Sequence, residues 1–252
     1  MPALRSAICA LLALVLTACA GFYRWEPADA SRRSAGAASG SLVGPDQYRV
    51  SRGDTLYSIA FRHNADFREL AQWNGIGPDY LIFPGQLLRL SPPAGAQTRP
   101  VAPPPGGRPQ PLPAPASREP APAAPPSGAP LNWVWPVQGS VTRGYALAQG
   151  SKGLDFTAPV GQPVVAAAPG KVVYSGNALR GYGELIIIKH DEVYLSAYGY
   201  NRQRLVQEGD FVTAGQPIAE VGLGPENKPL LHFEIRERGK PVNPAGFLPA
   251  RK

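Results

Sequence analysis

Cysteine and histidine are scarce in this chain, and their scarcity excludes several classes of protein. Only two of the 252 residues are cysteine, both among the first nineteen, so the rest of the chain cannot contain a disulfide framework. Histidine occurs three times, at His63, His190 and His232. The formal net charge is +7, but no run of five or more basic residues occurs, so a nucleic-acid-binding role is not expected.

Glycine and proline are abundant instead, with 28 and 30 residues, which indicates that part of the chain is not packed into a core. Residues 92–130 contain 15 of the 30 prolines and almost no large apolar residue. We expect an extended linker there, with a reach on the order of 100 Å at ~3 Å per residue. Residues 19–46 are rich in Ala, Ser, Gly and Arg and are predicted to form a flexible tether.

The first residues have the pattern of a secretion signal. Arg5 precedes an apolar run over residues 7–16, which is too short to span a bilayer but suits the core of a signal peptide over residues 1–18. Residues 16–19 read LTAC and resemble the lipobox of bacterial lipoproteins. The resemblance implies a lipid on Cys19 and, since no aspartate follows it, a position at the outer membrane facing the periplasm. An ordinary secretory signal with an incidental cysteine is the alternative.

Residues 47–91 have the pattern of a small α+β unit. The segment reads as a strand at Tyr48–Val50, a helix capped by Asp54 or Thr55, a second helix with the capping-box pair Asp66 and Glu69, and a strand at Gln86–Leu90. It resembles a LysM module over its whole length. LysM modules bind glycans that contain N-acetylglucosamine in a shallow groove between two loops. By position, the resemblance assigns glycan binding to Gly53, Asp54, Thr55, Leu56, Ile76, Gly77 and Leu81. For Leu56, a place in the core is the alternative.

Residues 131–252 consist of short apolar runs separated by glycine and proline. Runs such as KVVYSG, ELIIIKH and LLHFEIR are short, β-rich and evenly spaced, which predicts a mainly antiparallel β domain. Three stretches, SKGLDF, SAYGYN and PLLHFE, resemble the motifs of lysostaphin/LytM-type zinc peptidases, which are H-x-G-x-D, a histidine after a Y-A pair, and H-x-H. The resemblance covers about residues 133–248.

The motifs are incomplete at the positions that bind zinc and transfer protons. Carried over residue by residue, the first metal histidine falls on Ser151, while Asp155 and His232 keep the other two ligands. The two catalytic histidines fall on Tyr200 and Leu230. A catalytic zinc site needs three protein ligands and an open position for water. We therefore expect no catalytic residue, metal or cofactor, and we expect Asp155 and His232 to pair with each other as a remnant.

The order of lipobox, LysM module, linker and degenerate LytM domain resembles the NlpD-like murein hydrolase activator lipoproteins, as do the stretches GNALRGYG and YLSAY. The chain is short for such a protein, which leaves a shorter paralogue open. Family members of this kind bind peptidoglycan and activate N-acetylmuramoyl-L-alanine amidases at the division septum. The resemblance implies an amidase-binding groove formed by Ser151, Asp155, Arg180, Tyr200, Leu230 and His232, and it makes enrichment at the septum an expectation.

Two other functions stay open at this point. The first is a purely structural lipoprotein that binds peptidoglycan and has no effect on amidases. The second is an active zinc endopeptidase, which predicts tightly bound zinc and cleavage of cross-links that a chelator stops.

Overall fold

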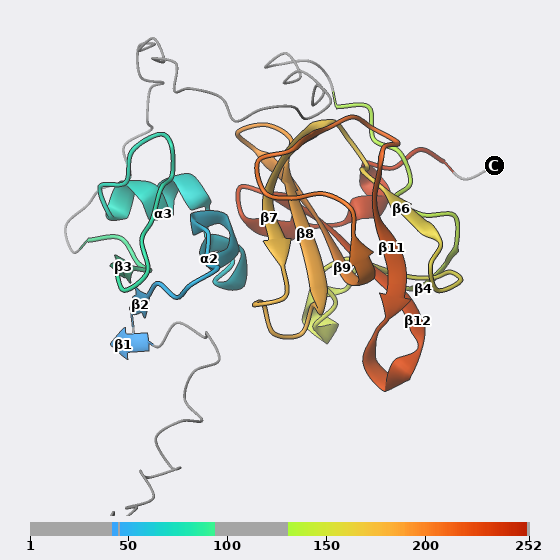
Figure 1. Cartoon of the computed structure of the whole chain (residues 1–252), viewed down its shortest axis with the longest axis horizontal. Coiled ribbons are helices and arrows are strands. Elements are labelled where there is room, and N and C mark those ends of the chain that lie inside the picture. Colours follow the sequence, from blue (N-terminus) through green and yellow to red (C-terminus); the bar gives the residue numbers. More distant parts are fainter. Residues whose placement is uncertain (1–41, 45, 94–130, 251–252) are drawn as a thin grey trace, which may run out of the picture. The chain divides into compact units, whose positions relative to one another are not determined.

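A computed structural model describes residues 42–44, 46–93 and 131–250 (Figure 1). The predicted signal peptide, Cys19, most of the tether and the linker from residue 94 lie outside the described residues. In the parts of the chain that are described, none of the helices has the length and apolar character needed to cross a membrane.

The LysM-like segment contains a three-stranded antiparallel sheet and two helices. The elements are β1 (Leu42–Gly44), β2 (Gln47–Arg49), α2 (Leu56–Arg62), α3 (Phe67–Trp73) and β3 (Leu87–Arg89), and the sheet order is β1-β2-β3. The predicted order of strand, helix, helix and strand is therefore confirmed. The interior side chains include Tyr48, Val50, Leu56, Ile59, Leu70 and Leu88, each at most 3% exposed.

Both helices of this segment begin at side-chain caps. Thr55 and Ser58 form a capping box, in which each side-chain oxygen accepts a hydrogen bond of 3.0 Å from the other residue's backbone N–H. Asp66 caps α3 by accepting from the N–H of Arg68 at 2.8 Å. The predicted pairing of Asp66 with Glu69 is wrong, because the Asp66 carboxylate binds the guanidinium of Arg68 and Glu69 is exposed.

Strand β1 lies inside the segment predicted to be a tether, so that prediction is wrong for residues 42–44. The strand pairs with β2, with Leu42 opposite Tyr48 and Gly44 opposite Gln47. The sequence pattern missed it because backbone hydrogen bonds to an edge strand need no apolar periodicity.

Residues 131–250 form a largely antiparallel β structure. Ten strands make one sheet: β4 (Ser140–Arg143), β5 (Leu154–Thr157), β6 (Pro163–Val165), β7 (Gly170–Gly176), β8 (Glu184–Lys189), β9 (Tyr194–Arg204), β10 (Phe211–Val212), β11 (Pro217–Leu223), β12 (Pro229–Glu237) and β13 (Lys240–Val242). The main order is β10-β7-β8-β9-β11-β12-β5-β4, with β13 beside β12 and β6 beside β11. Short 3-10 turns lie at Leu147–Gln149, Pro225–Asn227 and Pro244–Gly246. The predicted antiparallel β architecture is confirmed.

Strand β12 separates the hydrophobic core from the candidate site by alternation of its side chains. Leu231, Phe233 and Ile235 are fully buried in the core cluster. Since successive residues of a strand point to opposite faces, the even-numbered residues from Leu230 to Arg236 share the other face. The strand thus places His232 in a row with Leu230 and Glu234.

Candidate functional site

The site is centred on a pair of side chains from two neighbouring strands. Asp155 on β5 lies directly opposite His232 on β12 in the antiparallel register. The Nδ1 atom of His232 lies 2.6 Å from Oδ1 of Asp155, and the two side chains are 15% and 14% exposed. The hydrogen bond expected between these two residues is therefore present. It is short because the register holds both side chains on the same face of adjacent strands.

A row of buried charges continues from this pair along β12. Nε2 of His232 lies 3.0 Å from Oε1 of Glu234, and Nε of Arg236 donates to Oε2 of Glu234 at 2.8 Å. Glu234 and Arg236 have fully buried side chains, and Tyr182 donates its hydroxyl to Oε1 of Glu234 at 2.8 Å. Sequence reasoning missed these three residues, although the two-residue spacing from His232 could have revealed Glu234 and Arg236.

Within this row, the charged side chains stabilise one another in their ionised forms. Burial lowers the pKa of His232, but its hydrogen bonds to Asp155 and Glu234 outweigh this effect and raise the pKa to about 9. Burial raises the pKa of Glu234, but the neighbouring His232 and Arg236 outweigh it and hold the pKa at about 2. At neutral pH the imidazole is therefore protonated, and both of its N–H groups donate to carboxylates.

The side chain of Ser151 does not lie on the surface of the predicted partner-binding groove. Its side chain is buried, at 3% exposure for the residue. The hydroxyl donates to the backbone oxygen of Gly144 at 2.8 Å, within a bridge that pairs Ala146 with Ser151. A serine side chain is small enough to be buried within its own loop. The prediction that the Ser151 side chain lines the partner-binding groove is therefore wrong.

The remaining predicted residues surround the Asp155–His232 pair. The ring of Tyr200 lies 6.5 Å from the His232 ring, in edge contact. Leu230 precedes His232 by two residues on the same face of β12 and is partly exposed. Arg180 is exposed and belongs to the loop 177–183, whose Gly181 oxygen accepts a 2.6 Å hydrogen bond from the Tyr200 hydroxyl. We call Asp155, Arg180, Tyr200, Leu230 and His232 the candidate partner surface.

The residues at this site do not fit a catalytic zinc ion. The zinc peptidases that the motifs resemble bind zinc with three side chains; by that resemblance Ser151 stands at the position of the first, and its hydroxyl is bonded to its own loop. Both nitrogens of His232 are already hydrogen-bonded to carboxylates. Among the residues that the structure describes, no group of three His, Cys, Asp or Glu side chains is arranged to hold a metal.

The predicted glycan-binding residues of the LysM-like segment have different roles. Leu56 is only 1% exposed, so its side chain belongs to the core and its assignment to ligand contact is wrong. The carboxylate of Asp54, 2% exposed, accepts from the N–H of Ser51 and the hydroxyl of Tyr48, each at 2.8 Å. Thr55 caps α2. Leu56 thus packs in the core, whereas Asp54 and Thr55 hold the loop and the start of α2 in place.

The other predicted glycan residues lie at the surface or at its edge. Gly53 and Gly77 are exposed, Ile76 is partly buried, and Leu81 is 58% exposed. An edge contact of 5.6 Å between the rings of Tyr57 and Tyr80 brings the loop before β3 to the start of α2, next to the loop that holds Gly53. Sequence reasoning missed Phe83, an aromatic residue that is 62% exposed.

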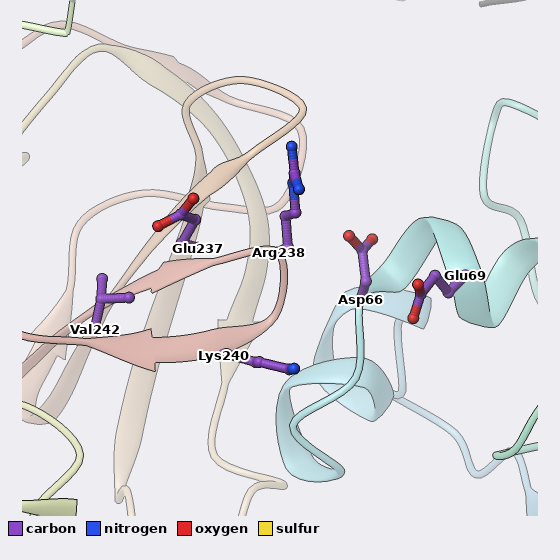
Figure 2. Close-up of a pocket in the computed structure, with 6 residues that line it drawn as sticks. All are labelled: Asp66, Glu69, Glu237, Arg238, Lys240 and Val242. Carbon is purple, nitrogen blue, oxygen red and sulfur yellow. The ribbon is translucent and has the colours of Figure 1, made fainter. Parts of the chain in front are cut away.

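Figure 2 shows a separate pocket that none of the predicted site residues lines. It is lined by the acidic residues Asp66, Glu69 and Glu237, the basic residues Arg238 and Lys240, and Val242. This mixture of charges is typical of a solvated surface and adds no chemistry to the candidate site.

Comparison with known proteins agrees with this architecture. Residues 48–91 match the LysM domain and residues 149–244 match Peptidase family M23. The lipoprotein NlpD/LppB homolog of Pseudomonas aeruginosa is 46% identical over 98% of this chain and 91% of its own length. The chain belongs to the NlpD/LppB family of lipoproteins. Over most of their lengths, this family member is also similar to two proteins of Escherichia coli.

The first of these is the uncharacterized lipoprotein YgeR, which is 40% identical over 80% of each chain. The second is the murein hydrolase activator NlpD, which is 39% identical over 81% of this chain and 68% of its own. The resemblance to NlpD-like lipoproteins with LysM and M23 domains is thus confirmed. A role in the cell wall follows for this NlpD/LppB family member.

Proposed function

We propose that this NlpD/LppB family protein is a non-catalytic activator of periplasmic N-acetylmuramoyl-L-alanine amidases. The observation that carries the proposal is the composition of the candidate site. Asp155 and His232 bond to each other, Ser151 is buried in place of a ligand, and Tyr200 and Leu230 take the positions of the catalytic histidines. Leu230 has no ionisable group, and the raised pKa of the Tyr200 hydroxyl makes it a poor substitute for an imidazole in proton transfer at neutral pH.

The same replacements make the surface suited to a protein partner. Tyr200 and Leu230 add partly exposed aromatic and aliphatic area beside the charged pair, and Arg180 adds an exposed cation. Aromatic and arginine side chains are the residue types most often decisive in protein interfaces. The amidase supplies the zinc and the catalytic groups, and binding to this surface stabilises its open state.

The LysM module and the lipid concentrate the activator near its substrate. We propose that the LysM surface around Gly53, Gly77 and Leu81 binds peptidoglycan glycan strands, with Phe83 adding an apolar face to it. We also propose that a lipid on Cys19 holds the protein at the periplasmic face of the outer membrane, with enrichment at the division septum. Two attachments on one chain raise the effective concentration of the far domain at the wall.

The test is release of dye from labelled sacculi by residues 20–252, with and without a purified amidase from the same cell. The proposal expects release only when both proteins are present. It expects Leu230→Ala and Arg180→Ala to weaken activation, while a change at exposed Leu205, outside the candidate partner surface, leaves it intact. Sacculus binding without any release favours a purely structural lipoprotein. Release by this protein alone, stopped by a chelator, favours a zinc endopeptidase.

A further inference from the structure

Tyr200 has a backbone conformation that bulky residues rarely adopt. Its φ is +61°, in the left-handed region, although it lies within strand β9. The register with β8 pairs Ile186 with Tyr198 and Glu184 with Asn201, so Gly199 and Tyr200 together oppose the single residue Leu185. This is a β-bulge, a feature that often redirects a side chain beside a functional site.

The bulge directs both polar groups of Tyr200 to one loop. Its backbone N–H donates to the oxygen of Tyr182 at 2.7 Å, and its hydroxyl donates to the oxygen of Gly181 at 2.6 Å. Burial and the charge of Asp155 raise the pKa of Tyr200, so the hydroxyl keeps its proton and remains a donor. The loop 177–183, which joins β7 to β8, is therefore held from β9 by two hydrogen bonds.

The loop also forms a side-chain hydrogen bond to β12, and its backbone lies close to β9. The hydroxyl of Tyr182 donates to Glu234 at 2.8 Å, and its ring lies 5.8 Å from that of His232. Gly183 has a φ of +61°, and a Cβ there would meet Tyr200 at 3.4 Å. A Cβ on Gly199 would meet the oxygen of Tyr182 at 3.1 Å. Glycine at 183 suits the left-handed backbone, and glycine at 199 permits the close approach.

Arg180 is the charged residue next to the two backbone oxygens, of Gly181 and Tyr182, that Tyr200 binds. It directly precedes Gly181, it is exposed, and within the described part of the chain it forms no ion pair. An exposed guanidinium on a fixed segment is pre-organised to take a carboxylate in bidentate geometry. We propose that Tyr200 is a positioning residue whose hydroxyl latches the loop 177–183 and so presents Arg180 to a carboxylate of the amidase. This inference rests on the proposed function and specifies the chemistry of its partner surface.

The test compares variants of residues 20–252 in amidase activation and in amide hydrogen exchange. Tyr200→Phe removes only the hydroxyl that bonds to Gly181. We expect it to raise the concentration needed for half-maximal activation by about two- to tenfold, the equivalent of one hydrogen bond. We also expect faster exchange at residues 180–183, where a change confined to the loop reports the latch whatever the global stability. Tyr145→Phe is the matched control, since its hydroxyl donates to the oxygen of Pro241 at 3.0 Å.

A double-mutant cycle separates the latch from a direct contact of Tyr200 with the amidase. If Tyr200 acts through Arg180, Tyr200→Phe has no further effect in an Arg180→Ala background. Full additivity overturns the inference, as does a Tyr200→Phe variant equal to the wild type in activation or in loop exchange. Arg180→Glu should weaken activation more than Arg180→Gln, and equal effects contradict the carboxylate partner. Wild-type protein that activates no amidase overturns the proposed function itself, whereas an active wild type with a silent Tyr200→Phe overturns only the latch.

Discussion

Replacement of Glu234 by Gln tests the buried row of charges behind the candidate site. The Glu234 and Arg236 side chains are both 0% exposed and are joined by a 2.8 Å ion pair. Removal of the carboxylate charge leaves the guanidinium of Arg236 buried without its counter-charge and takes one anion from His232. Breaking a buried pair in this way costs about 3–5 kcal/mol of unfolding free energy. For a domain of this size, that corresponds to a fall in Tm of roughly 10–20 °C.

The measurement is thermal unfolding of residues 20–252 by calorimetry, with attention to the transition of the C-terminal domain. Glu226→Gln is the matched control, because Glu226 pairs with Lys228 at 2.6 Å while both side chains are 74% exposed. That variant should change stability by less than about 0.5 kcal/mol. A cost for Glu234→Gln within about 1 kcal/mol of the control would contradict this expectation and would mean that the row is hydrated or repacks freely.

Four further outcomes follow from the same geometry. Burial lowers the pKa of His190 to about 4, so the unfolded state binds more protons than the folded state below pH 6.5. We therefore expect denaturant titrations to show a loss of up to about 3 kcal/mol of stability between pH 6.5 and 4, and we expect His190→Gln to reduce this pH dependence. Gly153→Ala places a Cβ 2.1 Å from the Phe233 oxygen and should lower Tm by at least about 10 °C, whereas Gly246→Ala, with nothing within 4 Å, should not. Zinc at about 100 μM should shift Tm by less than about 1 °C; a rise of several degrees that a chelator reverses would contradict the ligand count. A change of Leu81 to Ala should weaken co-sedimentation with sacculi, and unchanged binding would place the glycan surface elsewhere.

The strands were predictable from local signals, and the central pair from the resemblance to a known family. Apolar runs define β7, β8 and β12, whereas the resemblance to the zinc-peptidase motifs assigned Asp155 and His232 to one site. The antiparallel register places the two residues directly opposite each other, where their side chains form the 2.6 Å contact. The cap of α2 was also predictable from the sequence, since threonine is a preferred N-cap residue and Thr55 occupies that position.

What the sequence did not reveal depends on which hydrogen-bond partner each group takes, and a local pattern does not specify that partner. The burial of Ser151 follows from a bridge to Ala146, and the bulge at Tyr200 follows from the count of residues on β8. The cap partner of Asp66 depends on the competing guanidinium of Arg68, which is closer in the chain than Glu69. Local pattern carries no information on such competition between partners.

The most direct test of the central claim is dye release from labelled sacculi by residues 20–252 alone and together with an amidase from the same cell. We predict release only in the mixture, unaffected by prior treatment of this protein with a chelator that is then removed. Release by this protein alone, lost after the same treatment, would contradict it and identify the site at Asp155 and His232 as a working metal centre.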